Sequence, residues 1–142
     1  MTHMLLVEDD RDDAELVITG VRRAGMMQSI EWVADGAAAL DYLFRRGACA
    51  GRTTPDPAFV LLDLKMPKVD GFEVLRQLKA DGTLRRIPAV VFTSSSEASD
   101  MRMGYELGAN AYVVKPVDFA DLVATVGVIG RFWMAINRPP PG

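Results

Sequence analysis

The chain has 142 residues, of which 49% are hydrophobic and 25% are charged, and its formal net charge at pH 7 is -3. These values are typical of one soluble, folded domain and exclude collagen-like, fibrous and disordered chains. A net negative charge disfavours a protein whose main task is to bind the phosphate backbone of nucleic acid. With one cysteine and one histidine there is no internal disulfide and no Cys/His zinc site, which favours a reducing, cytoplasmic compartment.

Five short apolar runs rich in Val, Ile, Leu and Phe alternate with longer segments along the chain. The runs predict buried strands at 4–7, 30–33, 59–62, 89–92 and 111–114. The longer segments predict helices over about 12–24, 36–46, 71–80, 97–107 and 119–136. Alternating strands and helices favour a parallel sheet with helices on both faces. We therefore expect a doubly wound α/β fold of the flavodoxin-like (βα)5 type, with three layers around a central five-stranded parallel sheet.

The same elements predict the domain organisation. We expect one domain over residues 1–137, a proline-rich tail over 138–142 and no output domain. Residues 47–57 carry two glycines and two prolines and predict a long surface loop. The longest uncharged stretch near the C-terminus, 122–130, has nine residues, too few to cross a membrane. We therefore expect no membrane-spanning segment.

Polar residues directly follow four of the five predicted strands. Glu8 and Asp9 follow the first, Asp63 the third, Thr93 the fourth and Lys115 the fifth. Each alone has an ordinary explanation, such as an acidic helix start, a turn or a solvated charge. In an open α/β sheet, however, ligands bind beyond the carboxyl ends of the strands, where all four positions meet. Together these residues predict a functional site at that edge.

The chemistry of this set favours phosphoryl transfer assisted by a hard divalent cation. Mg²⁺ is usually held by one or two carboxylates together with phosphate oxygens and water. Asp63 can act as a carboxylate nucleophile, Thr93 can donate a hydrogen bond to a phosphoryl oxygen, and Lys115 can balance its charge. Phosphoryl transfer needs mainly positioning and charge neutralisation, which these residues supply.

Several motifs resemble the receiver domain of two-component response regulators, through nearly the whole chain. The LLVEDD stretch resembles the acidic pair after the first strand, with Glu8 and Asp9 in the paired positions. In LLDLKMPKVDG, Asp63 matches the phosphorylated aspartate, and in VFTSSS, Thr93 matches the switch hydroxyl. The AYVVKP stretch carries the switch aromatic and the lysine-proline pair, and its spacing from Asp63 also fits.

The resemblance implies roles for individual residues. Asp9, Asp63 and the backbone carbonyl of Lys65 would hold Mg²⁺, with Glu8 acting partly through water. Lys115 would pair with the phosphoryl group.

The family pattern also implies a switch. The Lys115–Pro116 peptide bond would be cis. Thr93 would move toward the phosphoryl group and Tyr112 would turn inward, which would reshape the surface formed by the fourth helix and the fifth strand.

The last predicted helix carries more apolar residues than one buried face needs. Its apolar stripe at spacings of three and four is typical of a core-facing side, yet further apolar residues lie off that stripe. An alternative is a second role in self-association or kinase contact. For that role the candidate interface residues are Phe119, Leu122, Val126, Phe132 and Trp133.

The long loop and the RFWMAINRPP ending resemble single-domain regulators that pair with bacterial phytochrome-type sensor histidine kinases. Members of that group dimerise through the fourth helix, fifth strand and fifth helix, so a homodimer is expected. Two alternatives stay open. A haloacid dehalogenase-like phosphohydrolase would need a second Asp where Lys65 stands, and a phosphorylation-independent binding scaffold would not need Asp9, Asp63, Thr93 and Lys115 together.

Overall fold

The computed structural model describes residues 2–26 and 30–141. Within these residues, five strands form one sheet in the order β2-β1-β3-β4-β5, and every neighbouring pair is parallel. The strands are Met4–Val7 (β1), Ile30–Val33 (β2), Phe59–Leu62 (β3), Ala89–Thr93 (β4) and Ala111–Val114 (β5). The predicted α/β fold is confirmed, and only β4 departs from its predicted bounds, by one added residue.

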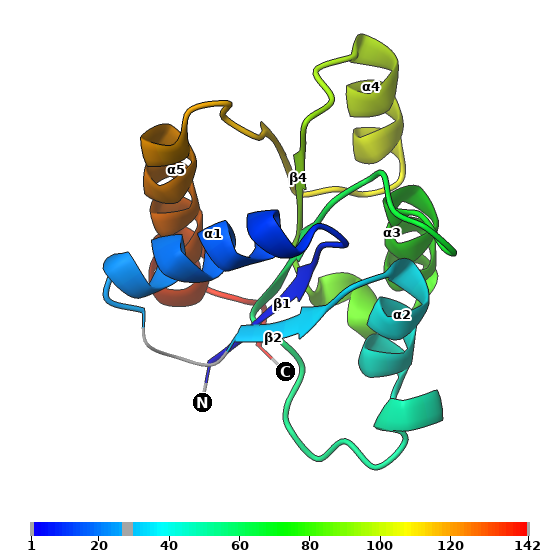
Figure 1. Ribbon diagram of the computed structural model, residues 1–142. Coiled ribbons are helices and arrows are strands. Elements are labelled where there is room, and N and C mark those ends of the chain that lie inside the picture. Colours follow the sequence, from blue (N-terminus) through cyan, green and yellow to red (C-terminus); the bar gives the residue numbers. More distant parts are fainter. Residues whose placement is uncertain (1, 27–29, 142) are drawn as a thin grey trace.

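Helices cover both faces of the sheet, as expected. α1 packs against α5 on one face, whereas α2 packs against α3, and α3 against α4, on the other (Figure 1). Aspartates begin four of these helices, because each N-cap side chain accepts a hydrogen bond from a backbone N–H of the first turn. The helices are Arg11–Arg23 (α1), Gly36–Phe44 (α2), Gly71–Ala80 (α3), Ala98–Glu106 (α4) and Phe119–Arg131 (α5), with short 3-10 turns at Gly47–Cys49 and Leu84–Arg86.

The alternating side chains of the central strands divide between two apolar clusters. In β1, Leu5 and Val7 join the cluster that contains residues of α2 and α3, while Met4 and Leu6 join the cluster that contains residues of α1 and α5. β1, β3 and β4 are fully buried. The expectation of burial is wrong for β2 and β5, which are partly exposed because each is an edge strand with one neighbour.

The last helix is shorter than predicted. α5 ends at Arg131 and the chain continues as a π-helical turn, Phe132–Ile136. Within the described residues, the stretch from Phe119 to Ile136 is long and apolar enough to cross a membrane by length and composition. Its apolar character has another explanation, since Leu122 and Val126 are buried in the core cluster beside α1.

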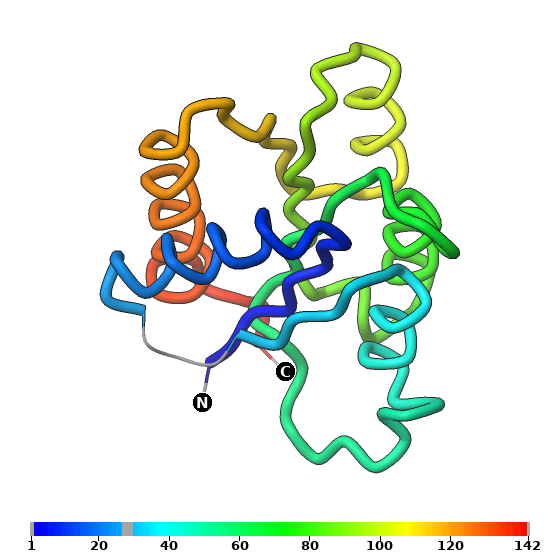
Figure 2. Tube along the Cα trace, viewed as in Figure 1, coloured from blue at the N-terminus to red at the C-terminus, as the bar shows by residue number. Residues whose placement is uncertain are grey.

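The predicted loop before β3 is held by the side chains of Arg45 and Arg52 at the amino end of the sheet, where the chain swings outward between α2 and β3 (Figure 2). The Arg52 guanidinium lies 4.3 Å from the centre of the Tyr42 ring and donates to the carbonyls of Tyr42 and Thr54. The hydroxyl of Tyr42 lies 2.8 Å from Nε2 of buried His3. The loop is therefore tied to α2 and to the residue before β1.

We predict that His3 makes the protein less stable in mild acid. Burial lowers the pKa of His3 below its ordinary value of about 6.5, and the nearby Arg52 charge lowers it further. Between the two values the unfolded chain binds more protons, so the free energy of unfolding falls as pH drops below about 6.5. Between pH 7.5 and pH 5.5, the free energy of unfolding measured in urea should fall less for His3→Gln than for wild type. Because His3 is the one histidine, its ring NMR signals report this pKa directly, and a value at or above 6.5 would contradict the prediction.

Candidate functional site

The parallel hydrogen-bond ladder continues one residue beyond the strands and so fixes the backbone of the predicted site residues. The N–H of Glu8 donates to Val33 at 3.1 Å, that of Asp63 to Val7 at 3.1 Å, and that of Lys115 to Thr93 at 2.7 Å. Each donor stands directly after its strand. The polar residues predicted at the carboxyl edge are therefore held there by the sheet itself.

Three carboxylates meet at this edge. One oxygen each of Glu8, Asp9 and Asp63 lies within 4.8 Å of the others, with Glu8 and Asp63 buried and Asp9 exposed. Burial raises the pKa of Glu8 to about 7, although the adjacent Lys115 ammonium opposes the rise. The carbonyl of Glu8 accepts a 2.8 Å hydrogen bond from Nε1 of Trp32, a neighbour that no sequence motif indicated. Oxygen donors of this kind fit a hard divalent cation.

Lys115 joins this cluster from the residue after β5, the edge strand opposite β2. Its ammonium lies 2.7 Å from Glu8 Oε1, 3.0 Å from Asp13 Oδ2 and 3.3 Å from Asp63 Oδ2. Burial disfavours the charged ammonium, but the carboxylates of Glu8, Asp63 and Asp13 outweigh it and raise the pKa of Lys115. Asp13 was missed from the sequence, because an acidic residue in the first turn of a helix is common for the helix dipole alone.

The expected cis bond between Lys115 and Pro116 is wrong, because the described residues contain no cis peptide bond. Trans is the favoured isomer of an X–Pro bond by about 0.5–1 kcal/mol. Lys115 reaches Glu8 and Asp63 from this trans backbone, so the lysine enters the site without the cis geometry.

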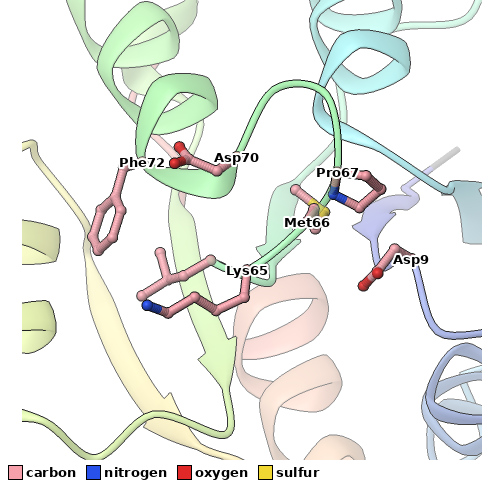
Figure 3. Close-up of a pocket in the computed structure, with 7 residues that line it drawn as sticks. Asp9, Lys65, Met66, Pro67, Asp70 and Phe72 are labelled. Carbon is pink, nitrogen blue, oxygen red and sulfur yellow. The ribbon is translucent and has the colours of Figure 1, made fainter.

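A cleft of about 400 Å³ opens beside the carboxylates (Figure 3). Asp9 lies on one side of it next to Met66 and Pro67, while the Lys65 side chain extends away from Asp9. The Lys65 ammonium instead lies 3.6 Å from Asp100 Oδ2 at the start of α4. The backbone nitrogen of Lys65 is 3.5 Å from Asp63 Oδ1, so the start of the loop after β3 lies next to the predicted nucleophile.

The two predicted switch residues meet the same loop after β4. The hydroxyl oxygen of buried Thr93 is 3.4 Å from the N–H of Ser95, and the Tyr112 hydroxyl donates to the Ser95 carbonyl at 2.9 Å. Ser95 also donates to Asp100 at 2.6 Å. Thr93 and Tyr112 are thus linked through one short loop.

The candidate interface residues predicted for the last helix divide into a buried group and a group that is at least partly exposed. Leu122 and Val126 are buried inside the chain, so their assignment to an interface is wrong, and they belong to the core-facing stripe. Trp133 is half-buried, and its ring centre lies 6.4 Å from that of Phe59. Phe119 and Phe132 are exposed. Spacing alone could not separate the two groups, because buried and exposed apolar residues share this helix.

The chain matches the family model described as "Response regulator receiver domain" over residues 4–127. Among curated proteins, it is 47% identical to the probable methanogenesis regulatory protein FilR2 of Methanothrix harundinacea. That alignment spans 137 residues, which is 96% of this chain and 86% of FilR2.

Three solved structures are similar over nearly the whole chain. The phosphorylated cyanobacterial phytochrome response regulator RcpA is 34% identical with a TM-score of 0.92, and 99% of both chains is covered. The Mn²⁺-bound response regulator Rcp1 is 34% identical with a TM-score of 0.84, covering 99% of this chain and 100% of that one. The bacteriophytochrome response regulator RtBRR is 50% identical with a TM-score of 0.78, covering 100% and 86%. With its acidic cluster, its lysine and its parallel sheet, the chain belongs to the response regulator receiver family of two-component systems.

Proposed function

We propose that this protein is a single-domain response regulator that accepts a phosphoryl group from a sensor histidine kinase onto Asp63. The observation that carries the proposal is the meeting of Glu8, Asp9, Asp63 and Lys115 at the carboxyl edge of the sheet. A dehalogenase-like phosphohydrolase is not favoured, because the family match lies elsewhere and Lys65 stands where a second Asp is needed.

The nucleophile of the proposed transfer is the carboxylate of Asp63. One of its oxygens forms a bond to phosphorus while the bond from phosphorus to the histidine nitrogen of the kinase breaks. Lys115 then pairs with the phosphoryl oxygens, and the Thr93 hydroxyl turns to donate to one of them. Water later attacks phosphorus, the bond from phosphorus to the Asp63 oxygen breaks, and inorganic phosphate leaves as the carboxylate is restored. The protein thus assists its own phosphorylation and dephosphorylation, and the group it modifies is its own Asp63.

The proposed cation is Mg²⁺, held by Asp9, Asp63 and the backbone carbonyl of Lys65, with Glu8 acting partly through water. Its chemistry, when bound, is neutralisation of charge on the phosphoryl oxygens. Support comes from the carboxylate donors and from the similar regulator Rcp1, which was solved with Mn²⁺.

The proposed partner is a sensor histidine kinase of the bacterial phytochrome type, in the cytoplasm. The printed descriptions of RcpA and RtBRR, a phytochrome and a bacteriophytochrome response regulator, support this partner. We propose that residues 1–137 act as the receiver unit and 138–142 as its tail, with signalling through the domain's own surface rather than through nucleic acid or a membrane.

The proposed function is tested by incubating the protein with a small-molecule phosphodonor, with and without Mg²⁺, and measuring the intact mass. The expected result is one added phosphoryl group that depends on Mg²⁺ and disappears on addition of a chelator. An unchanged mass of the wild-type protein under all conditions would instead favour a binding scaffold that never takes phosphate.

We also propose that the switched form dimerises through the face formed by α4, β5 and α5. Exposed apolar side chains on this face support the proposal, namely Tyr105 on α4, Val114 on β5 and Phe119 on α5. Thr93 and Tyr112 are coupled to the adjoining loop, so phosphorylation at Asp63 can reshape this surface.

For this dimer we predict that Val114→Lys weakens self-association at least about tenfold, because it places a charge in an apolar contact. Val128→Lys is the matched control, since Val128 is also exposed but lies beside the groove between α1 and α5. Sedimentation with and without beryllofluoride measures the effect. Equal monomer masses at all concentrations in both states would remove the proposed dimer.

A further inference from the structure

The Lys115 ammonium has no free proton to offer an incoming group. A lysine ammonium carries three donors, and here each has a carboxylate acceptor, from Glu8, Asp13 and Asp63. Two of these carboxylates belong to the proposed cation cluster, whereas Asp13 does not. Asp13 is thus a partner of Lys115 that the proposed chemistry leaves unexplained.

Asp13 differs from the other two carboxylates in exposure. Its side chain is 33% exposed, compared with 2% for Glu8 and 11% for Asp63. Its backbone is nevertheless held in the first turn of α1, because its N–H donates to Asp10 Oδ1 at 3.0 Å. Of the three acceptors, Asp13 is the one that can return to water at the lowest desolvation cost.

We propose that Asp13 is a positioning residue for Lys115. Its carboxylate is an exchangeable counter-ion of the Lys115 ammonium and opposes the arrival of the phosphoryl group. This inference rests on the proposed phosphorylation of Asp63. A phosphoryl group brings about 1.5 to 2 negative charges. It competes with the Asp13 carboxylate for one ammonium and is also repelled by it, so both effects act in the same direction.

The affinities for a phosphoryl mimic and for Mg²⁺ should therefore change in opposite directions in the Asp13→Asn variant. Loss of the carboxylate removes a competitor for Lys115, which strengthens binding of a phosphoryl mimic. The same loss removes negative charge near the cation cluster, which weakens binding of Mg²⁺. A merely structural role for Asp13 would shift both affinities the same way or neither.

The test measures Mg²⁺ binding alone and then beryllofluoride binding at saturating Mg²⁺. Trp32 is the reporter, since its Nε1 donates to the Glu8 carbonyl, and Trp133→Phe removes the second tryptophan from every variant. We expect Asp13→Asn to bind beryllofluoride about three- to tenfold more tightly and Mg²⁺ more weakly.

Two variants serve as controls. Asp12→Asn makes the same charge change on the neighbouring, exposed residue of α1 and is expected to change both affinities less than twofold. Asp13→Glu keeps the charge and should return both affinities toward wild type.

Each outcome decides between the two proposals. If wild type binds beryllofluoride but Asp13→Asn matches Asp12→Asn, or binds the mimic more weakly, the exchange role is overturned while the proposed function stands. If wild type itself does not bind beryllofluoride with Mg²⁺, the proposed function fails.

Discussion

Asp63→Asn is expected to lower the rate of phosphorylation by a small-molecule phosphodonor by more than about a hundredfold. The amide keeps the size of the side chain but has no anionic oxygen to attack phosphorus. The neighbouring carboxylates of Glu8 and Asp9 occupy other positions of the cluster, where they are proposed to serve the cation, so neither is expected to take over with the same geometry. Intact-mass measurement over time gives the rate.

Asp70→Asn is the matched control for this loss. Asp70 lines the cleft beside Asp9 and caps α3, a role that asparagine fulfils equally well. The control should take up phosphoryl at the wild-type rate. Undiminished uptake by Asp63→Asn would mean that another residue is the acceptor.

The second large effect is expected for Gly71→Ala, which should lower the free energy of unfolding by about 3 kcal/mol. A Cβ at this position would lie 2.1 Å from the carbonyl oxygen of Asp63 and 2.7 Å from Cα of Leu64. Both are backbone atoms, so no side chain can move aside. The N–H of Gly71 donates to the Leu64 carbonyl at 2.9 Å, and relief of the clash would also displace Asp63.

Gly82→Ala tests whether this cost comes from the contact or from the residue type. Among the residues that the structure describes, nothing lies within 4 Å of a Cβ at Gly82, so its substitution should change stability by less than about 1 kcal/mol. Denaturant unfolding of both variants, together with phosphoryl uptake, measures the two effects. Similar stabilities for the two variants would contradict the steric explanation.

The sequence predicted the architecture closely because the buried strands are continuous apolar runs. Met4–Val7 and Phe59–Leu62 were recognised to the residue, since nothing polar interrupts them. The end of α5 was not predicted correctly, because residues 132–136 continue the same apolar pattern in a π-helical turn. A pattern of apolar residues therefore locates a helix but does not report whether its last turn keeps α-helical hydrogen bonds.

The site was predictable in its members but not in their pairing. Asp63 and Lys115 stood out because each follows a strand and matches a motif. The bond between Lys115 and Asp13 joins residues 102 positions apart, and no local pattern signals it. The buried state of Leu122 was likewise undecidable, since helical spacing is the same for a core face and an interface. Contacts between residues far apart in the sequence become visible only in the folded chain.

The most direct test of the central claim is to locate the phosphoryl group. After treatment of the wild-type protein with a phosphodonor and Mg²⁺, borohydride reduction converts a phosphorylated aspartate to homoserine, which peptide mass spectrometry can place in the sequence. We predict homoserine at Asp63 and at no other carboxylate. Homoserine at Asp9 or Asp10, or none in protein whose mass shows an added phosphoryl group, would contradict it.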